Sequence, residues 1–257
     1  MCRLLAYLGP DRSLEHLLLT PPHSLLRQSW APRFQTRGTV NADGFGVGWY
    51  VPAVRPEPVQ YRRAMPIWSD RSFASLAGTV LAPAVLASVR DATPPSPSEE
   101  TSTAPYLAGR WLFAHNGEVR GFAAGGKVAL LAALSVERAA TITGTADSEV
   151  LFALALDQID AGAPPAAALE AVVRRIQTAS PGSRLNMVLT DGEHLGATAC
   201  GDSLFVLETG APHGAQHSTV IASEPYDDDP AWVRVADGSV VAATRGEPSR
   251  TRPMVAA

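Results

Sequence analysis

The second residue of the chain is a cysteine, and its position gives it a possible chemical use. Cys2 and Cys200 are the two cysteines among 257 residues. If Met1 is removed, Cys2 gains a free α-amine, and an amine with a pKa of about 7.7–8.0 can accept a proton near neutral pH. A thiol with a pKa of about 8.5 needs such a base before it attacks an amide. Cys2 is therefore a candidate nucleophile that carries its own base. The alternative is a small buried residue of a first strand.

Three other residues have the chemistry to hold the two charged ends of an amino acid. Arg90 and Thr93 end a predicted strand. A guanidinium pairs with a carboxylate through two parallel hydrogen bonds, to which a hydroxyl can add a third. Asp147 stands at the start of a predicted helix, where its carboxylate can bind an ammonium group. Each also has an ordinary structural explanation: a surface arginine for Arg90, and a helix cap that complements the helix dipole for Asp147.

The stretch FAHNGEV places Asn116 next to Gly117 between two apolar runs. This pair is a strong hairpin signal, and we expect a tight turn here. Such a turn can aim the asparagine amide and the glycine N–H at one point, where they would stabilise an oxyanion. The loss of one such donor costs roughly 2.7–4 kcal/mol of transition-state stabilisation. The glycines of NADGFGVGWY (41–50) can let backbone approach a ligand, or belong to an ordinary hairpin strand.

The elements that must position these residues follow from hydrophobic periodicity. The chain shows strands first, then helices, then strands again, which favours antiparallel sheets with helices on their faces: an α+β layered domain. Residues 20–34, rich in proline, are expected to be irregular, and residues 1–257 to form one domain. Strands are predicted over 2–9, 44–52, 58–65, 85–93, 184–191, 195–202, 203–208, 218–224, 232–238 and 239–244. Helices are predicted over 11–19 (capped by Asp11 or Ser13), 69–80 (capped by Ser69), 127–140, 147–162 and 164–179.

Composition excludes several classes of protein. The net charge is −4 without a basic cluster, which argues against nucleic acid or an anionic membrane as partner. No signal peptide is recognised, and no apolar run reaches the roughly 20 residues of a membrane span. Two cysteines make no disulfide framework, so we expect a cytoplasmic protein. The six histidines show no metal spacing, and no metal or other cofactor is expected.

Taken in order, these motifs resemble the glutaminase domain of class II glutamine amidotransferases, which are N-terminal nucleophile hydrolases. Within that family, PPHSLLRQSWAPR, GTVNADGFGVGWY, WSDRSFASLA and GRWLFAHNGEV are most similar to the amidohydrolases of ergothioneine biosynthesis. The resemblance extends through ASEPYDDDPAW and covers nearly the whole chain. It implies a four-layer αββα sandwich of two antiparallel sheets.

The resemblance also implies roles for single residues. Cys2, at the start of the mature chain, would be the nucleophile, and its own α-amine the base. Asn116 and the Gly117 N–H would form the oxyanion hole. Arg90 and Thr93 would bind the α-carboxylate of a γ-glutamyl group, and Asp147 would bind its α-ammonium group.

Two positions depart from the family pattern. Ala104-Pro105 stands where many amidotransferases have His-Pro, and Asp91 follows the arginine where an aromatic residue is frequent. Both departures concern the pocket beyond the glutamyl group rather than the reaction itself.

The resemblance further implies the substrate γ-glutamyl-hercynylcysteine sulfoxide, a small molecule that would be hydrolysed to glutamate and hercynylcysteine sulfoxide. A glutaminase domain without a synthase domain to receive ammonia suits such a hydrolysis. The alternatives are a hydrolase of glutathione-like peptides, a glutaminase subunit that feeds a partner, and a binding module without activity. Aromatic faces bind trimethylammonium groups such as the one in the hercynyl half. The candidates for that contact are Trp30, Trp49, Trp68 and Trp111, each of which could instead be core. The sequence leaves the oligomeric state open.

Overall fold

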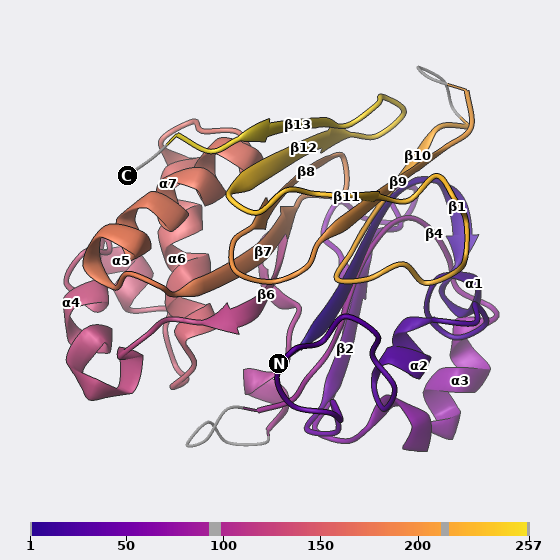
Figure 1. The fold of residues 1–257 in the computed structure, drawn as a ribbon, viewed down its shortest axis with the longest axis horizontal. Helices are drawn as coiled ribbons and strands as arrows, with labels where there is room; N and C mark the ends of the chain where they lie inside the picture. Colours follow the sequence, from indigo (N-terminus) through magenta and orange to yellow (C-terminus); the bar gives the residue numbers. More distant parts are fainter. Residues whose placement is uncertain (1, 93–98, 212–215, 256–257) are drawn as a thin grey trace.

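Two antiparallel sheets form the centre of the molecule, and helices cover their outer faces (Figure 1). The computed structural model describes residues 2–92, 99–211 and 216–255. The α+β prediction is confirmed. The first sheet has the order β11-β9-β10-β1-β4-β2-β3 and the second β13-β12-β8-β7-β6-β5.

The strands of the first sheet are β1 (Arg3–Ser13), β2 (Phe45–Trp49), β3 (Val59–Arg63), β4 (Leu81–Val89), β9 (Phe205–Thr209), β10 (Ser218–Ala222) and β11 (Val233–Arg234). Those of the second are β5 (Tyr106–Ala108), β6 (Trp111–Glu118), β7 (Arg184–Thr190), β8 (His194–Ala199), β12 (Ser239–Thr244) and β13 (Arg250–Pro253). The α-helices are α1 (Leu14–Leu18), α2 (Leu25–Gln28), α3 (Arg71–Ala77), α4 (Lys127–Leu131), α5 (Val136–Ala139), α6 (Asp147–Asp160) and α7 (Pro165–Ala179). Short helical turns occur at η1 (Ile67–Ser69), η2 (Glu100–Ser102) and η3 (Phe122–Gly126).

The apolar strand β1 lies in the middle of the first sheet, between β10 and β4. Because side chains alternate along a strand, Leu4 and Ala6 point to one face of the sheet and Leu5 and Tyr7 to the other. The second face carries α1, α2 and α3. Each large apolar side chain buried in this way contributes about 1.5–3 kcal/mol relative to leaving it exposed.

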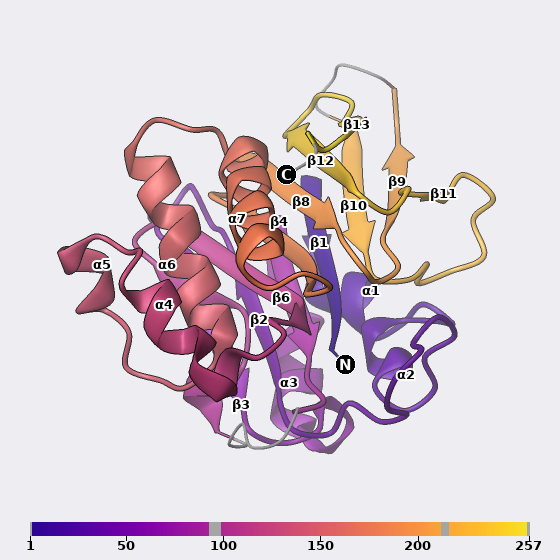
Figure 2. The ribbon, with the colours of Figure 1, turned by 60° about the vertical axis from the view of Figure 1, so that its left-hand side comes forward.

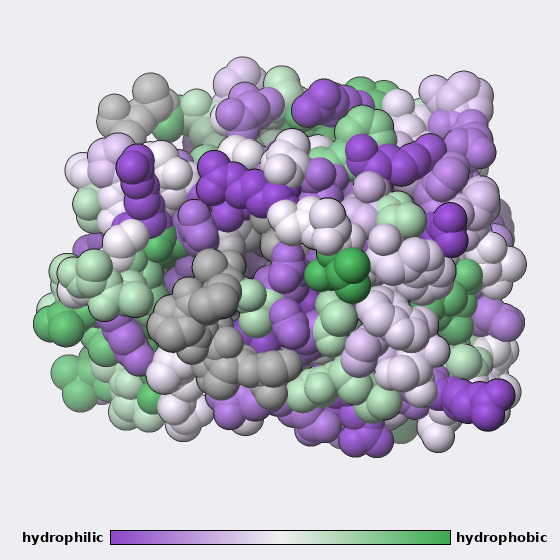
Figure 3. All heavy atoms as spheres, turned by 60° about the horizontal axis from the view of Figure 1, so that its bottom comes forward, coloured by the Kyte–Doolittle hydropathy of each residue, from purple (hydrophilic) through white to green (hydrophobic). Residues whose placement is uncertain are grey.

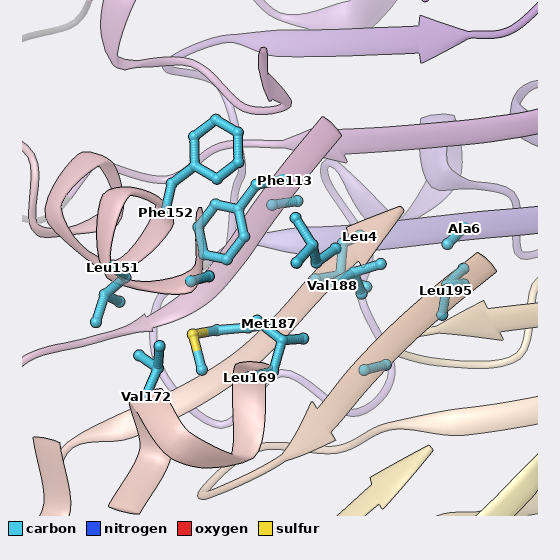
Figure 4. Close-up of a cluster of buried hydrophobic side chains, with 14 of the residues drawn as sticks. Leu4, Ala6, Phe113, Leu151, Phe152, Leu169, Val172, Met187, Val188 and Leu195 are labelled. Atoms are coloured by element: carbon cyan, nitrogen blue, oxygen red, sulfur yellow. The ribbon is translucent and has the colours of Figure 1, made fainter. Parts of the chain in front are cut away.

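The first face of β1 packs on the second sheet. Figure 4 shows Leu4 and Ala6 of β1 toward Val188 and Leu195, while Met187 points the other way, toward residues of α6 and α7. The order of layers is therefore helices, sheet, sheet, helices, and Figure 2 shows α6 and α7 covering the second sheet. The predicted four-layer arrangement is confirmed.

Several predictions of local structure are confirmed. Strands β2 and β3 pair as expected, and Ser13 caps α1 by accepting a hydrogen bond from the His16 N–H at 3.1 Å. The predicted helix 69–80 is observed as α3 over Arg71–Ala77, with Asp70 rather than Ser69 as its cap.

Other predictions need correction. Residues 20–34 are not wholly irregular, since Ser24 caps the short helix α2. The predicted helix 127–140 is split into α4 and α5, because the Ser135 side chain caps a new helix start. Strands β5 and β13 were not predicted. No helix in the described part of the chain is long and apolar enough to cross a bilayer.

The hairpin expected at Asn116-Gly117 is wrong. Both residues lie inside β6, where Asn116 pairs with Asn186 and Gly117 with Leu185 of β7. The turn instead lies at residues 109–110, where Gly109 has a φ of 55° between β5 and β6. The pairing with β7, about 70 residues further along the chain, overrides the local turn signal.

Candidate active site

Three of the sequence motifs meet at one end of the first sheet. Cys2 is half-buried and stands directly before β1, whose start is marked N in Figures 1 and 2. Arg3 pairs with Val89 in β4, so the antiparallel register places the following residue, Arg90, beside Cys2. The glycine-rich strand β2 continues this arrangement, because the Arg90 N–H donates to the Gly44 carbonyl at 2.8 Å.

Arg90 is held by its backbone and is 7% exposed. Its carbonyl accepts a hydrogen bond from the Asp43 N–H at 2.9 Å, and Asp43 in turn accepts from the Ala92 N–H at 2.7 Å. The aspartate of the DGFG motif thus fixes the chain on either side of Arg90. Thr93, the predicted partner of Arg90, lies outside the described residues.

The facing sheet supplies Asn116 and Gly117. Strand β6 packs against β1 and β4. The Asn116 side chain is 0% exposed, yet neither its Oδ1 nor its Nδ2 has a hydrogen-bond partner among the described residues. An unsatisfied buried polar group costs about 1–3 kcal/mol. This amide is therefore kept at a cost to stability.

Gly117 cannot be replaced by another residue without a shift of the backbone. Its φ is 153°, and a Cβ built there would lie 2.0 Å from the carbonyl oxygen of Arg184. The close approach of β6 and β7 at this point requires a glycine.

Asp147 is tied to the end of β6. It is the first residue of α6, and the helix cap is Ala146, so the capping role considered for Asp147 is not observed. Asp147 Oδ2 instead accepts a hydrogen bond from the Val119 N–H at 2.8 Å. The carboxylate therefore lies close to the chain that carries Asn116 and Gly117.

His115, the residue before Asn116 in β6, contacts both β7 and α6. Its Nε2 lies 3.0 Å from the Arg184 carbonyl, which can only accept, so Nε2 carries a proton. Its Nδ1 lies 3.0 Å from Ser148 Oγ in the first turn of α6. The histidine of the H-N-G motif thus anchors β6 to β7 and to the helix that starts with Asp147. The sequence analysis did not assign it a role.

The pKa of a buried tyrosine, Tyr106 of β5, is affected by charges from several of these segments. Burial raises the pKa of Tyr106 well above its ordinary value. The charges of Glu149 and Asp147 raise this pKa further, that of Arg90 lowers it, and Cys2 also acts on it. The charges that act on this phenol thus come from α6, from the residue after β4 and from the residue before β1.

A second buried group, Asp202, forms an ion pair with Arg184 of β7 at 3.0 Å. Burial raises the pKa of Asp202, while the charges of Arg184, Arg3 and His115 lower it. Arg3 follows Cys2, and His115 precedes Asn116. The pKa of the Asp202 carboxylate is therefore affected by charges at the start of β1 and in β6. Arg3 itself pairs with Glu224 at 3.4 Å, a contact between residues 221 positions apart that no sequence motif announced.

The tryptophans differ in exposure. Trp49 is buried and Trp111 is half-buried against the core, whereas Trp30 and Trp68 are 38% and 42% exposed. The rings of Trp30 and Trp68 contact each other edge to face, with centroids 5.6 Å apart. These two remain candidates for an aromatic contact with a ligand.

The face turned forward in Figure 3 has hydrophilic residues near its middle, with hydrophobic residues on both sides of them. Within the described ranges, no group of three or more His, Cys, Asp or Glu residues could hold a metal ion.

The second cysteine, Cys200, is buried at the end of β8, and burial raises the pKa of its thiol.

Comparison with known proteins identifies relatives along most of the chain. Residues 24–219 match the family model described as "Glutamine amidotransferases class-II". The chain is 39% identical over 244 residues to the gamma-glutamyl-hercynylcysteine sulfoxide hydrolase of Mycolicibacterium smegmatis, covering 94% of this chain and 95% of that protein.

Solved structures agree with this assignment. A glutamine aminotransferase class-II domain protein from Silicibacter pomeroyi superposes with a TM-score of 0.70 at 27% identity, covering 98% of this chain and 99% of that one. The glutamine phosphoribosylpyrophosphate amidotransferase of Bacillus subtilis shares the fold, with a TM-score of 0.64 at 15% identity over 99% of this chain and 49% of its own. The chain belongs to the class II glutamine amidotransferase family.

Proposed function

We propose that this protein hydrolyses the γ-glutamyl amide bond of γ-glutamyl-hercynylcysteine sulfoxide, releasing glutamate and hercynylcysteine sulfoxide. The substrate is suggested by the name of the 39% identical relative, which matches over nearly its full length. The observation that carries the chemistry is the position of Cys2 at the head of the central strand β1. Arg90 lies beside it, and the Asn116 amide, which has no hydrogen-bond partner among the described residues, lies on the facing sheet.

The reaction begins when Met1 has been removed and the α-amine of Cys2 is free. The amine takes the thiol proton, and the sulfur forms a bond to the γ-carbonyl carbon. The carbonyl oxygen becomes an oxyanion, which accepts hydrogen bonds from Asn116 Nδ2 and the Gly117 N–H. The protonated amine then gives its proton to the leaving nitrogen as the C–N bond breaks. Water, activated by the same amine, cleaves the thioester and releases glutamate.

The glutamyl group is held by its two charged ends. Arg90 and Thr93 bind the α-carboxylate, and Asp147 binds the α-ammonium group. Asp147 Oδ2 accepts from the Val119 N–H and its Oδ1 accepts from Ser148 Oγ at 3.3 Å, but a carboxylate accepts several hydrogen bonds, so it can also bind an ammonium group. We further propose that residues 1–257 act as one glutaminase-type domain on a small-molecule substrate in the cytoplasm.

Turnover of three substrates tests this proposal. We expect kcat/KM to be highest for γ-glutamyl-hercynylcysteine sulfoxide and lower for glutathione and for glutamine. A preference for glutamine would contradict the substrate and favour a glutaminase, the activity for which the family is named. The Cys2→Ala variant is the control for the chemistry, and full activity in that variant would refute the nucleophile.

A further inference from the structure

The residue after the proposed nucleophile is an arginine whose side chain is completely buried. Arg3 is 0% exposed, and so is its partner Glu224. Burial lowers the pKa of Arg3, and Glu224 raises it again. A buried charge is costly unless it is paired and hydrogen-bonded, so the presence of this side chain needs an explanation.

The ion pair alone does not explain the geometry. A guanidinium that serves a carboxylate usually donates two parallel hydrogen bonds. Here a single Nη1 contact reaches Glu224 at 3.4 Å, and Nη2 is buried without a hydrogen-bond partner among the described residues. The shortest bond is made by Nε, which donates to the backbone carbonyl of Cys2 at 2.7 Å. The geometry of the guanidinium therefore favours the hydrogen bond to the Cys2 carbonyl over the contact with Glu224.

Glu224 is itself fixed from the other side. Its Oε2 accepts hydrogen bonds from the Arg33 N–H at 2.6 Å and the Phe34 N–H at 3.3 Å. One residue earlier, the Ser223 N–H donates to the Leu4 carbonyl, and Ser223 Oγ accepts from the Leu4 N–H, both at 3.0 Å. The segment after β10 therefore provides a rigid base next to the start of β1.

Cys2 needs such a support because it lies outside the sheet. The regular strand begins at Arg3, and terminal residues fray unless they are tied down. A nucleophile must stand within a fraction of an ångström of its reacting position, and a misplacement of about 1 Å can cost about 100-fold in rate. The Arg3 hydrogen bond fixes the peptide group that joins Cys2 to the strand, and with it the Cα that carries both thiol and amine.

We propose that Arg3 is a positioning residue, which acts with Glu224 as a clamp on the carbonyl of Cys2 and holds the thiol and the α-amine at the site. This inference deepens the proposed function and rests on Cys2 being the nucleophile. It also holds for any γ-glutamyl substrate, because it concerns the attacking residue and not the leaving group.

Two variants separate a clamp from a simple charge pair. Arg3→Lys keeps a cation for Glu224 but has no Nε to donate to Cys2. The double variant Arg3→Met with Glu224→Gln removes both charges and leaves no unpaired carboxylate in the core, while the glutamine oxygen can still accept from Arg33 and Phe34. The control is Arg252→Met with Glu170→Gln, a more exposed pair on β13 and α7 with bonds of 3.0 and 2.5 Å.

The readout that does not depend on the substrate is the rate of alkylation of Cys2 by iodoacetamide, measured across pH in a Cys200→Ala background. We expect both Arg3 variants to lower this rate and kcat by about tenfold to 100-fold, with KM changed less than about threefold. The control pair should leave both rates unchanged.

Rates within about twofold of the parent in a folded Arg3→Lys variant or in the folded double variant would overturn the clamp. If one of them fails to fold, the other decides. Failure of the proposed function looks different: the parent protein would then not hydrolyse γ-glutamyl substrates, while the alkylation rates would still report on Arg3.

Discussion

Asn116 offers a sharp separation of stability from activity. Its amide is 0% exposed and has no hydrogen-bond partner among the described residues, so its removal leaves no protein group unsatisfied. We predict that Asn116→Ala lowers kcat by about 100-fold to 1,000-fold, the loss expected for one oxyanion donor. The free energy of unfolding should stay within about 1 kcal/mol of wild type, because the loss of packing is offset by removal of an unsatisfied group that costs about 1–3 kcal/mol.

Asn186 is the matched control, since it is the direct cross-strand neighbour of Asn116 and is 1% exposed. Its Oδ1 accepts from the Cys200 and Asp202 N–H groups, and its Nδ2 donates to the Asp202 and Ser203 carbonyls. Asn186→Ala leaves these backbone groups without a partner. We expect it to lower the free energy of unfolding by at least about 2 kcal/mol.

Both quantities can be measured on the same preparations. Thermal unfolding gives the melting temperature, and a change of 1 kcal/mol shifts it by roughly 2–4 °C in a chain of this size. Initial rates at saturating substrate give kcat. The reasoning is refuted if Asn116→Ala destabilises the protein as much as Asn186→Ala does while kcat stays within about threefold of wild type.

Three other changes have defined outcomes. Arg90→Lys keeps the charge but loses the planar fork, so kcat/KM for a γ-glutamyl substrate should fall at least about tenfold, and a near-normal value would exclude the carboxylate contact. Gly117→Ala forces a Cβ against the Arg184 carbonyl, so it should lower both the melting temperature and kcat, and an unchanged melting temperature would show that β6 and β7 can separate. The hydrogen bond from Arg252 holds the pKa of Glu170 below its ordinary value, so this pair stabilises the fold above the unfolded pKa of about 4.5 and is lost as the pH falls. Arg252→Met should therefore lower the melting temperature at about pH 7, and the difference from the parent should shrink as the pH falls below about 4.5, whereas a difference that does not change with pH would show that packing, not charge, is responsible.

The residues of the site that stand next to the ends of strands, Cys2 and Arg90, could be predicted from the sequence. Strands over 2–9 and 85–93 were expected, and once β1 and β4 pair, Cys2 and Arg90 must be neighbours. The position of Cys2 behind Met1 suggested its chemistry without any structure. The layered α+β arrangement followed from the order of strands and helices along the chain.

The features that were missed depend on contacts between distant segments. The Asn-Gly pair has the local pattern of a turn, but its pairing with Asn186 and Leu185 keeps it in a strand. Arg3 reads as an ordinary charged residue after a short apolar start, and only the folded chain brings Glu224 to it. The cap of α3 was misplaced by one residue because Ser69 and Asp70 are both good caps and adjacent.

The central claim is that one residue supplies both the attacking sulfur and the proton acceptor, and the intact mass of the active protein tests it most directly. Mass spectrometry of a fully active preparation should show a chain lighter than the encoded sequence by one methionine, with Cys2 at its start. A preparation of full specific activity whose chains retain Met1 would contradict the account, because the nitrogen of Cys2 would then be an amide and could not accept the thiol proton.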